Sequence, residues 1–328
     1  MARNRYYAGA PTDHFDGVRF FNPGQLSTDR SLGALLRWRF GGGRARWPRR
    51  VANAPVAKPA ARVDGVSITM VGHATVLIQL AGINLLVDPV WSERASPLRW
   101  AGPKRVNDPG VEFADLPPID VVLITHNHYD HLDRATLRRL WDTHRPRIIA
   151  PLGNESLIAK TIGAAKAETA DWGDTVPVGG DVRVTIVPAH HWSARVLGDR
   201  RMALWCGFII QSPAGLVYNV GDTAYGDGRI FSDIRSRFGA PDVAILPIGA
   251  YEPRWFMKAQ HTNPDESVRI MMACGAQQGL GVHWGTFQLT NEARVAPKEA
   301  LAAALRHHGI APDRFLAFEP GDVWSKTS

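Results

Sequence analysis

The sequence predicts an α/β protein in which two β-sheets pack together inside and helices cover them outside. Short apolar runs separated by glycine-containing turns recur between residues 66 and 282, as expected for strands that meander within sheets. Helical patterns are interspersed after the first group of strands, and that order favours a layered sandwich. With 328 residues, of which 45% are hydrophobic, the chain can bury a full core.

The N-terminal fifth of the chain precedes the first strand. Residues 32–40 are expected to form a short helix of aromatic and basic character. Residues 41–61 are expected to form an irregular linker, because three consecutive glycines and three prolines fall within them. The first strands are expected at residues 66–71, 76–80 and 83–87. A long polar loop follows at residues 88–118, and a loop of that length inside a compact domain is usually functional.

The next strand, at residues 121–125, leads into a polar turn and a helix at residues 134–144. Further strands are expected at residues 147–150, 182–187, 203–211, 216–220, 243–246 and 279–282. Further helices are expected at residues 154–162, 229–238, 264–274 and 297–308. The third of these has the clearest signals, because Asn263 can cap its start, Pro264 suits its first position and Gly275 can end it.

Positive charge is concentrated at the N-terminus. Residues 1–62 hold twelve Arg and Lys and three Asp, a net charge of +9, whereas the whole chain carries +7. We therefore divide the chain into a basic, aromatic N-terminal arm with its linker (residues 1–62) and a main domain (residues 63–328). Such an arm suits an anionic membrane surface. A nucleic-acid partner is disfavoured because the main domain is nearly neutral, and a tail without any partner is the third alternative.

Some classes of protein are excluded by what the sequence lacks. No stretch approaches the roughly 18 apolar residues that a membrane-spanning helix needs. The charged start of the chain has no apolar segment behind it, so we expect no secretory signal. Cys206 and Cys274 are far apart and lie in apolar surroundings, as is typical of a reducing compartment. We expect a cytoplasmic protein that can attach peripherally to a membrane.

Four potential metal ligands follow the strand at residues 121–125. They are His126, His128, Asp130 and His131, and their imidazole nitrogens and carboxylate oxygens suit zinc and its neighbours in the first transition row. If the chain stays extended, His126 and His128 point the same way, while Asp130 and His131 turn toward a second position. Two adjacent ions would use all four ligands. The alternative is a solvated polar turn.

Three later apolar runs also end in a metal-binding residue. They lead to His191, Asp222 and His283, with His190 directly before the first of these. Strand ends that meet at one edge of a sheet are natural places for a site. A single strand-end His is usually structural, and Gly-Asp-Thr is usually a turn. Together with the first cluster, however, the three residues supply the ligands that a two-metal site still needs.

The complete pattern His126-x-His128-x-Asp130-His131, His191, Asp222 and His283 resembles the metallo-β-lactamase superfamily. The resemblance implies an αββα sandwich with two zinc ions between the sheet edges, although iron or manganese would also accept these donors. In that pattern one ion is held by His126, His128 and His191, the other by Asp130, His131 and His283, with Asp222 bridging them. The pattern places the ligand before Trp192, so His190 is expected to be structural.

Further motifs resemble one branch of that superfamily, the phospholipase D that hydrolyses N-acylphosphatidylethanolamine. They are Gly72-His73-Ala74-Thr75, Asp88-Pro89-Val90, His191-Trp192-Ser193, the run from Pro247 to Lys258, and His283-Trp284-Gly285-Thr286-Phe287. This resemblance implies attack of a metal-bound hydroxide on a phospholipid phosphodiester, which gives phosphatidic acid and an N-acylethanolamine. It also allows a homodimer.

Other residues are candidates for supporting roles. His261, together with Asp130 and Asp222, is expected to be catalytic, by hydrogen bonding the phosphate or protonating the leaving oxygen. Tyr129, Gln260 and Trp192 are candidates for substrate binding, and His73 is expected to orient a metal ligand by a hydrogen bond. The alternatives are structural: a solvent-facing His261, a packed Tyr129 and a His73 that stabilises its turn.

Two other functions compete with this hypothesis. The same scaffold could serve a nuclease or a hydrolase of phosphorylated lactones. From another class, zinc could merely stabilise a non-catalytic binding module. A structural zinc site is usually closed and holds one ion with four ligands, so seven ligands for two ions argue against the module.

Overall fold

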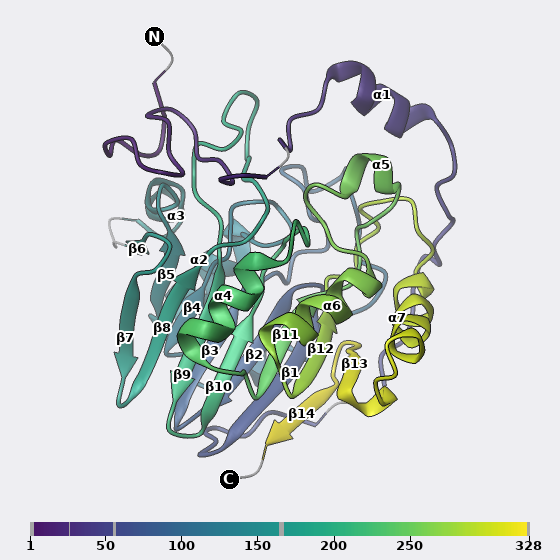
Figure 1. Cartoon of the computed structure of the whole chain (residues 1–328). Helices are drawn as coiled ribbons and strands as arrows, with labels where there is room; N and C mark the ends of the chain where they lie inside the picture. Colours follow the sequence, from purple (N-terminus) through teal and green to yellow (C-terminus); the bar gives the residue numbers. More distant parts are fainter. Residues whose placement is uncertain (1–2, 26, 55–56, 164–166, 327–328) are drawn as a thin grey trace.

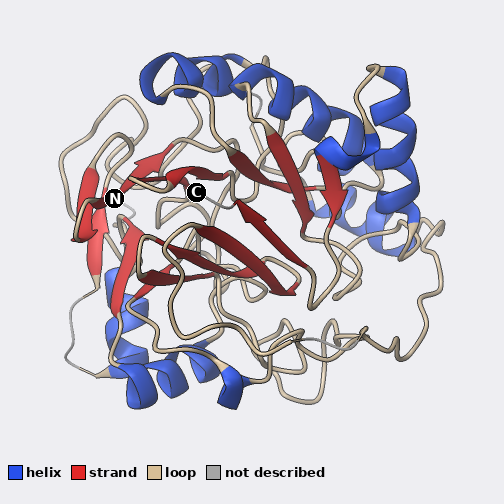
Figure 2. Cartoon of the chain, turned by 90° about the horizontal axis from the view of Figure 1, so that it is seen from below, coloured by secondary structure: helices blue, strands red, loops and turns tan. Residues whose placement is uncertain are grey.

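The computed structural model describes residues 3–25, 27–54, 57–163 and 167–326, and it confirms the predicted fold class. Two seven-stranded sheets pack face to face, and helices lie on both outer sides of the strands (Figures 1 and 2). Ile68, Ile78, Val184, Phe208 and Ile245 are among the buried residues of the core between the sheets. The apolar runs of the sequence form strands whose apolar side chains are buried between the two sheets.

The first sheet has the order β14-β1-β2-β3-β4-β5-β6. Its strands are β1 (Val66–Gly72), β2 (Thr75–Leu80), β3 (Ile83–Val87), β4 (Val121–Leu123), β5 (Arg147–Pro151), β6 (Glu168–Ala170) and β14 (Val323–Lys326). The strands from β14 to β3 pair antiparallel, and those from β3 to β6 pair parallel.

The second sheet repeats this mixed plan in the order β13-β12-β11-β10-β9-β8-β7. Its strands are β7 (Thr175–Gly179), β8 (Val182–Val187), β9 (Gly207–Ser212), β10 (Gly215–Asn219), β11 (Val243–Pro247), β12 (Gln278–Val282) and β13 (Phe315–Ala317). The strands from β7 to β10 pair antiparallel, and those from β10 to β13 pair parallel.

Helices cover the outer face of each sheet through separate apolar clusters. Helices α2 (Arg134–His144) and α3 (Glu155–Ile162) pack on the first sheet. Helices α4 (Arg229–Phe238), α6 (Pro264–Cys274) and α7 (Ala296–His307) pack on the second. The predicted start of α6 is confirmed, since Asn263 and Glu266 form a reciprocal capping box. The short 3-10 helices are η1 (Phe113–Asp115) and η2 (Pro312–Arg314).

Several short elements were not predicted from the sequence. They are β6, β7, β13, β14 and the one-turn helix α5 (Arg254–Met257). The predicted start of the strand at residues 203–211 was wrong, because β9 begins only at Gly207. Upstream of it, the N–H groups of Leu204 and Cys206 donate to the carbonyls of Leu152 (2.8 Å) and Thr125 (3.0 Å), on segments of the first sheet. These bonds tie the two sheets together.

The N-terminal segment lies across one end of the sandwich, seen as the dark purple trace at the top of Figure 1. Phe15 and Phe20 are each 1% exposed and pack with Leu204 and Trp205. Helix α1 (Leu32–Phe40) forms as predicted, and all nine of its residues are at least partly exposed. The predicted linker is irregular where it is described, with residues 55–56 outside the described part. The domain boundary at residue 62 stays a prediction.

The described residues contain no helix with the length and apolar character of a membrane span.

Candidate metal centre

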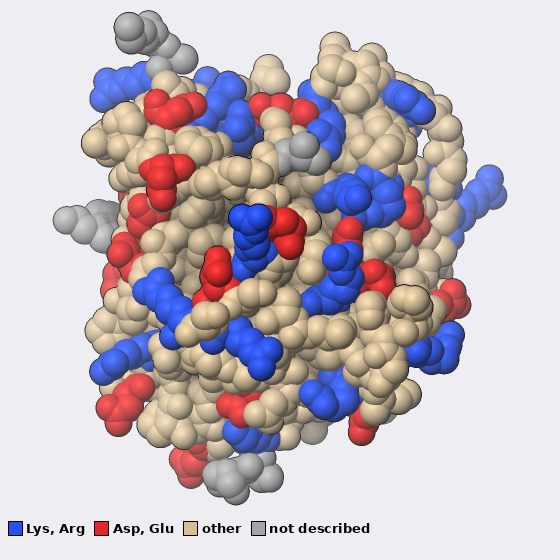
Figure 3. All heavy atoms as spheres, in the orientation of Figure 1, with Lys and Arg blue, Asp and Glu red and all other residues tan. Residues whose placement is uncertain are grey.

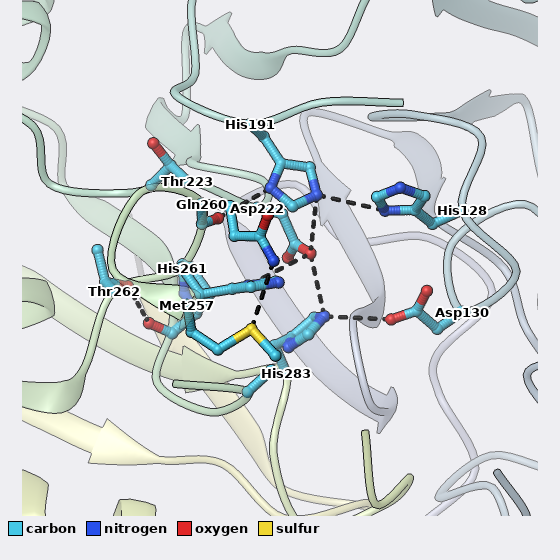
Figure 4. Close-up of polar contacts among 12 residues, drawn as sticks. His128, Asp130, His191, Asp222, Thr223, Met257, Gln260, His261, Thr262 and His283 are labelled. Carbon is cyan, nitrogen blue, oxygen red and sulfur yellow. Dashed lines mark hydrogen bonds and ion pairs between the residues drawn. The ribbon is translucent and has the colours of Figure 1, made fainter. Parts of the chain in front are cut away.

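The seven predicted ligands lie together at one end of the sandwich. The turn with His126, His128, Asp130 and His131 follows β4, and the other three residues follow strands of the second sheet. His191 comes after β8, Asp222 after β10 and His283 after β12. Figure 4 shows His128, Asp130, His191, Asp222 and His283 directed toward one another. The ligand atoms of His126 and His131 lie within 4.8 Å of others in the set. Because parallel neighbours end at the same edge, the strand ends deliver residues from distant parts of the chain to one place.

The first group consists of three imidazoles. His128 Nδ1 lies 2.8 Å from His126 Nε2 and 3.3 Å from His191 Nε2. A tetrahedral ion bound at about 2.1 Å holds its ligand atoms roughly 3.4 Å apart, so this spacing fits a metal. Burial lowers the pKa of His128 and of His191 to about 3, and it holds the pKa of His126 well below its usual value. The three rings are therefore neutral, as metal ligands must be.

The second group joins two imidazoles to two carboxylates. Asp130 Oδ2 lies 3.5 Å from His131 Nε2 and 3.3 Å from His283 Nε2. Asp222 Oδ2 lies 3.3 Å and 3.2 Å from the same two nitrogens. Each of these four nitrogen–oxygen distances is close to the separation of neighbouring ligand atoms around a tetrahedral ion. Although burial opposes it, the carboxylate of Asp222 raises the pKa of His283 to about 9, so positive charge is favoured between these groups.

Asp222 lies between the two groups. Its Oδ2 atom is 3.6 Å from His191 Nε2 and 4.0 Å from His126 Nε2, in addition to its contacts in the second group. Despite the cost of burial, the surrounding histidines hold the pKa of this carboxyl well below its usual range. A single charged oxygen therefore faces both candidate ion positions.

Asp88 supports both groups, and the sequence analysis did not identify it as a site residue. Its Oδ2 atom accepts hydrogen bonds from His131 Nδ1 (2.8 Å) and from the Thr125 hydroxyl (2.6 Å). The Thr125 oxygen lies 3.0 Å from His126 Nδ1 and can accept its proton. Protons on both Nδ1 atoms leave the Nε2 atoms of His126 and His131 free to face the centre. Its sequence signals were a carboxylate at the end of an apolar run and its place in the motif Asp88-Pro89-Val90.

His73 lies against the second group, with a ring nitrogen within 4.8 Å of ligand atoms of Asp130, His131 and His283. Its Nε2 is 3.0 Å from Asp130 Oδ2, and its carbonyl accepts the N–H of His283 at 2.7 Å. Burial lowers the pKa of His73 to about 4, so the neutral ring can donate to Asp130. This geometry suits the orienting role expected for His73, and it also holds the backbone of His283.

His190 and His191 point in different directions. The Nδ1 atom of His191 donates to the Gln260 carbonyl (2.8 Å), so its Nε2 faces the first group. His190 instead lines a separate cavity beside Gly226 and Asp227. The structure thus brings His191, and not His190, to the other predicted ligands.

The residues expected to bind substrate line a cavity of about 580 Å³ above the ligands. His261 Nδ1 lies 3.9 Å from Asp222 Oδ2, and the ring of Trp192 packs edge-on against His128. Tyr129 also lines the cavity, but its hydroxyl donates to the Arg195 carbonyl (2.7 Å). Gln260 contributes its carbonyl to His191 and its amide to Met257 Sδ (3.3 Å). Their roles stay predictions.

Part of the cavity wall comes from the N-terminal arm, which sequence reasoning had treated separately. Asp29, Arg30, Leu35 and Trp38 line the cavity together with residues of the main domain. Trp38 stacks on Phe256 with ring centres 4.9 Å apart, and its Nε1 donates to Asn291 Oδ1 (3.2 Å). No local sequence signal connects these residues to the ligands, because the contact exists only in the folded chain.

Comparison with known proteins agrees with this geometry. Residues 83–284 match the family described as "Beta-lactamase superfamily domain". The chain is 36% identical over 272 residues to N-acyl-phosphatidylethanolamine-hydrolyzing phospholipase D 1 of Caenorhabditis elegans, which covers 80% of this chain and 76% of that protein. The mitochondrial enzyme of that name in Saccharomyces cerevisiae is 35% identical over 225 residues, 67% of this chain and 47% of that protein.

Among solved structures, Igni18, a metallo hydrolase from Ignicoccus hospitalis, has the same fold. The two chains align with a TM-score of 0.59 at 20% identity, covering 80% of this chain and 99% of Igni18. The sequence relatives and the shared fold agree on one assignment. The chain therefore belongs to the metallo-β-lactamase superfamily, in its N-acyl-phosphatidylethanolamine-hydrolysing phospholipase D branch, and is a metal-dependent hydrolase.

Proposed function

We propose that the protein is a dinuclear zinc phosphodiesterase of the phospholipase D type. Its substrates are N-acylphosphatidylethanolamine-like phospholipids, and its products are phosphatidic acid and N-acylethanolamine. The observation that carries this proposal is the cavity of about 580 Å³, which combines a floor of predicted metal ligands with a largely apolar wall. A phosphodiester that carries acyl chains matches both halves of such a pocket.

The floor and wall of the cavity differ in character. His128, Asp130, Asp222 and His261 are at the floor. The apolar wall is formed by Leu35, Trp38, Ala95, Phe256, Met257 and Leu289. Burying an acyl chain against such a wall gains about 0.8 kcal/mol per methylene group, which favours an amphipathic substrate over a fully polar one.

Arg200 adds positive charge to the wall of the cavity. Its guanidinium lies 3.4 Å from the centre of the Trp192 ring, and its Nε donates to Asp29 (3.0 Å). The stacked ring and the carboxylate hold the cation in place beside the floor. A fixed cation there attracts the phosphodiester anion toward the predicted metal ligands.

In this proposal each residue of the site has a separate role in hydrolysis. His126, His128 and His191 would hold one ion, Asp130, His131 and His283 would hold the other, and Asp222 would be shared between the two groups. When bound, the two ions supply Lewis acidity, which lowers the pKa of water toward 7 and neutralises charge on a phosphoryl oxygen. Imidazole and carboxylate donors suit zinc, although iron and manganese accept them as well.

His261 is the proposed proton donor. It follows Gln260 in the cavity floor, and its Nδ1 is buried without a hydrogen-bond partner among the described residues. An imidazole N–H at that place can donate to the phosphate or to the leaving alkoxide oxygen. The ring regains its proton from the water that is consumed, so the leaving group departs as a neutral alcohol.

The arm is the proposed contact with an anionic membrane surface. Leu32 (71% exposed) and Phe40 (78% exposed) project from α1 beside Arg37 and Arg39. In Figure 3 the surface over α1 is largely tan, with blue Arg side chains at its margin. Exposed apolar and basic residues in one short helix favour binding at the interface of a membrane. Leu35 and Trp38 of the same helix line the cavity. Docking of α1 on a membrane would therefore place the mouth of the cavity at the lipid.

The substrate is tested with metal-quantified protein on a panel. N-acylphosphatidylethanolamine in mixed micelles, single-stranded RNA and a phosphorylated lactone are assayed side by side. We expect release of N-acylethanolamine at a rate far above any turnover of the other two. Robust RNA or lactone cleavage without lipid turnover would contradict the proposal.

A further inference from the structure

Arg195 lies directly behind the turn that carries four of the predicted ligands. Its Nη1 donates hydrogen bonds to the carbonyl oxygens of Leu132 (2.6 Å), Asn127 (3.1 Å) and His128 (3.4 Å). The guanidinium lies 3.9 Å from the centre of the Tyr129 ring, and the Tyr129 hydroxyl donates back to the Arg195 carbonyl. One side chain therefore binds the backbone at both ends of the turn.

The backbone of Arg195 is held in turn by a buried carboxylate. Asp199 is 1% exposed, and its oxygens accept the N–H groups of Arg195 (3.0 Å) and Val196 (2.9 Å). The hydroxyl of Tyr6 donates to the same carboxylate at 2.7 Å. Burial and the charge of Asp199 raise the pKa of Tyr6, so its hydroxyl keeps the proton that it donates.

Tyr6 is anchored by its own neighbours. The side chain of Asn4 donates to the carbonyls of Val18 (2.7 Å) and Met202 (2.9 Å), and its Oδ1 accepts the N–H of Tyr6 (2.7 Å). A continuous set of hydrogen bonds thus leads from residue 4 through Tyr6, Asp199 and Arg195 to the turn. A separable membrane arm would not require such bonds.

We propose that Arg195 is a positioning residue for the metal centre, and that Tyr6 holds it in place through Asp199. The N-terminal segment thereby sets how tightly the turn at residues 126–131 retains its metal. A turn whose carbonyls are already fixed loses less conformational freedom when its side chains bind an ion. This inference rests on the proposed metal site, but not on the proposed substrate.

The test is a zinc titration of the full chain against a competing chromophoric chelator. The variants are Tyr6→Phe, Arg195→Met, Arg195→Lys and the double variant Tyr6→Phe/Arg195→Met. Tyr7→Phe is the matched control, since the Tyr7 ring packs on Phe15 and Phe20. We expect Arg195→Met to weaken zinc binding roughly tenfold or more, and Tyr6→Phe roughly threefold. Arg195→Lys should be intermediate, because an ammonium can replace the Nη1 donor but not the planar guanidinium stacked on Tyr129.

The double variant separates positioning from general destabilisation. If Tyr6 acts through Arg195, its replacement should change the zinc Kd by less than about twofold once Arg195 is Met. The Tyr7→Phe protein should bind like the wild type. A wild-type Kd in Arg195→Met, or an equal effect of Tyr6→Phe in both backgrounds, would overturn the inference.

The experiment also covers a variant that fails to fold and a wrong choice of substrate. If Arg195→Met does not fold, Tyr6→Phe and Arg195→Lys still decide the question, because a wild-type Kd in both would overturn the inference. Lipid turnover is measured on the same wild-type protein. Normal zinc binding without lipid turnover contradicts the proposed substrate alone, whereas normal turnover with unchanged zinc affinity in the variants contradicts the positioning role.

Discussion

The carboxylate of Asp88 accepts a hydrogen bond of 2.8 Å from His131 Nδ1, and both side chains are almost fully buried. The same Oδ2 atom accepts the hydroxyl of Thr125, whose oxygen faces His126 Nδ1. One residue outside the predicted ligand set therefore fixes ring orientation in both ligand groups. A carboxylate that accepts a hydrogen bond from a metal-binding histidine strengthens the site, because it holds the imidazole in the correct tautomer.

Replacement of Asp88 by Asn should weaken metal binding without removing a ligand. The amide removes the negative charge and can donate to His131 Nδ1, which favours the wrong tautomer. We expect zinc affinity to fall roughly 10- to 100-fold. Isothermal titration of metal-stripped protein measures it, with Asp142→Asn in the exposed pair with Arg138 as the control. Equal affinities in Asp88→Asn and wild type would show that Asp88 does not support the centre.

His261→Gln should lower the rate of hydrolysis while leaving the metal content unchanged. Loss of a proton donor in the transition state typically costs a factor of 10² to 10⁴ in rate. We expect kcat for the lipid to fall within that range, as measured by release of N-acylethanolamine, with zinc per chain equal to that of the wild type. A loss of bound zinc would instead identify His261 as a ligand, and an unchanged kcat would remove it from the mechanism.

Arg39→Gln should weaken binding to anionic vesicles. Each basic residue near an anionic surface contributes about 1 kcal/mol, which corresponds to roughly fivefold in the partition coefficient. Sedimentation with vesicles that contain phosphatidylserine measures this, and hydrolysis of micellar substrate should stay close to normal. Arg306→Gln, at the exposed end of α7, is the matched control. Equal losses in both variants would point to bulk charge and not to a docking surface.

Phe20→Ala should destabilise the whole chain, because Phe20 is buried against Phe15 and Tyr7. Removal of a buried Phe side chain typically lowers the free energy of unfolding by about 3–5 kcal/mol. Urea denaturation followed by circular dichroism tests this, with the exposed Phe40→Ala as the control. A change below about 0.5 kcal/mol would mean that residues 3–25 fold apart from the sandwich.

The sequence predicted the site best where residues that can bind metal follow directly after apolar strands. His126 to His131, His191, Asp222 and His283 each follow an apolar run, so their convergence could be anticipated from topology. Asp88 and Arg195 act through hydrogen bonds between segments that are distant in sequence, and such pairs leave no local pattern. The strands β13 and β14 were missed because they are short and partly exposed, so the apolar signal of a buried strand is weak.

Metal content measured together with turnover decides whether the protein has a two-metal centre that hydrolyses a phospholipid. Zinc, iron and manganese are counted per chain by mass spectrometry in wild type and Asp222→Asn, and lipid hydrolysis is assayed on the same samples. We expect close to two zinc ions per wild-type chain, and loss of metal and of most activity in Asp222→Asn, because that variant lacks the negative charge shared by both ligand groups. One tightly held ion per chain, or normal turnover in Asp222→Asn, would contradict it.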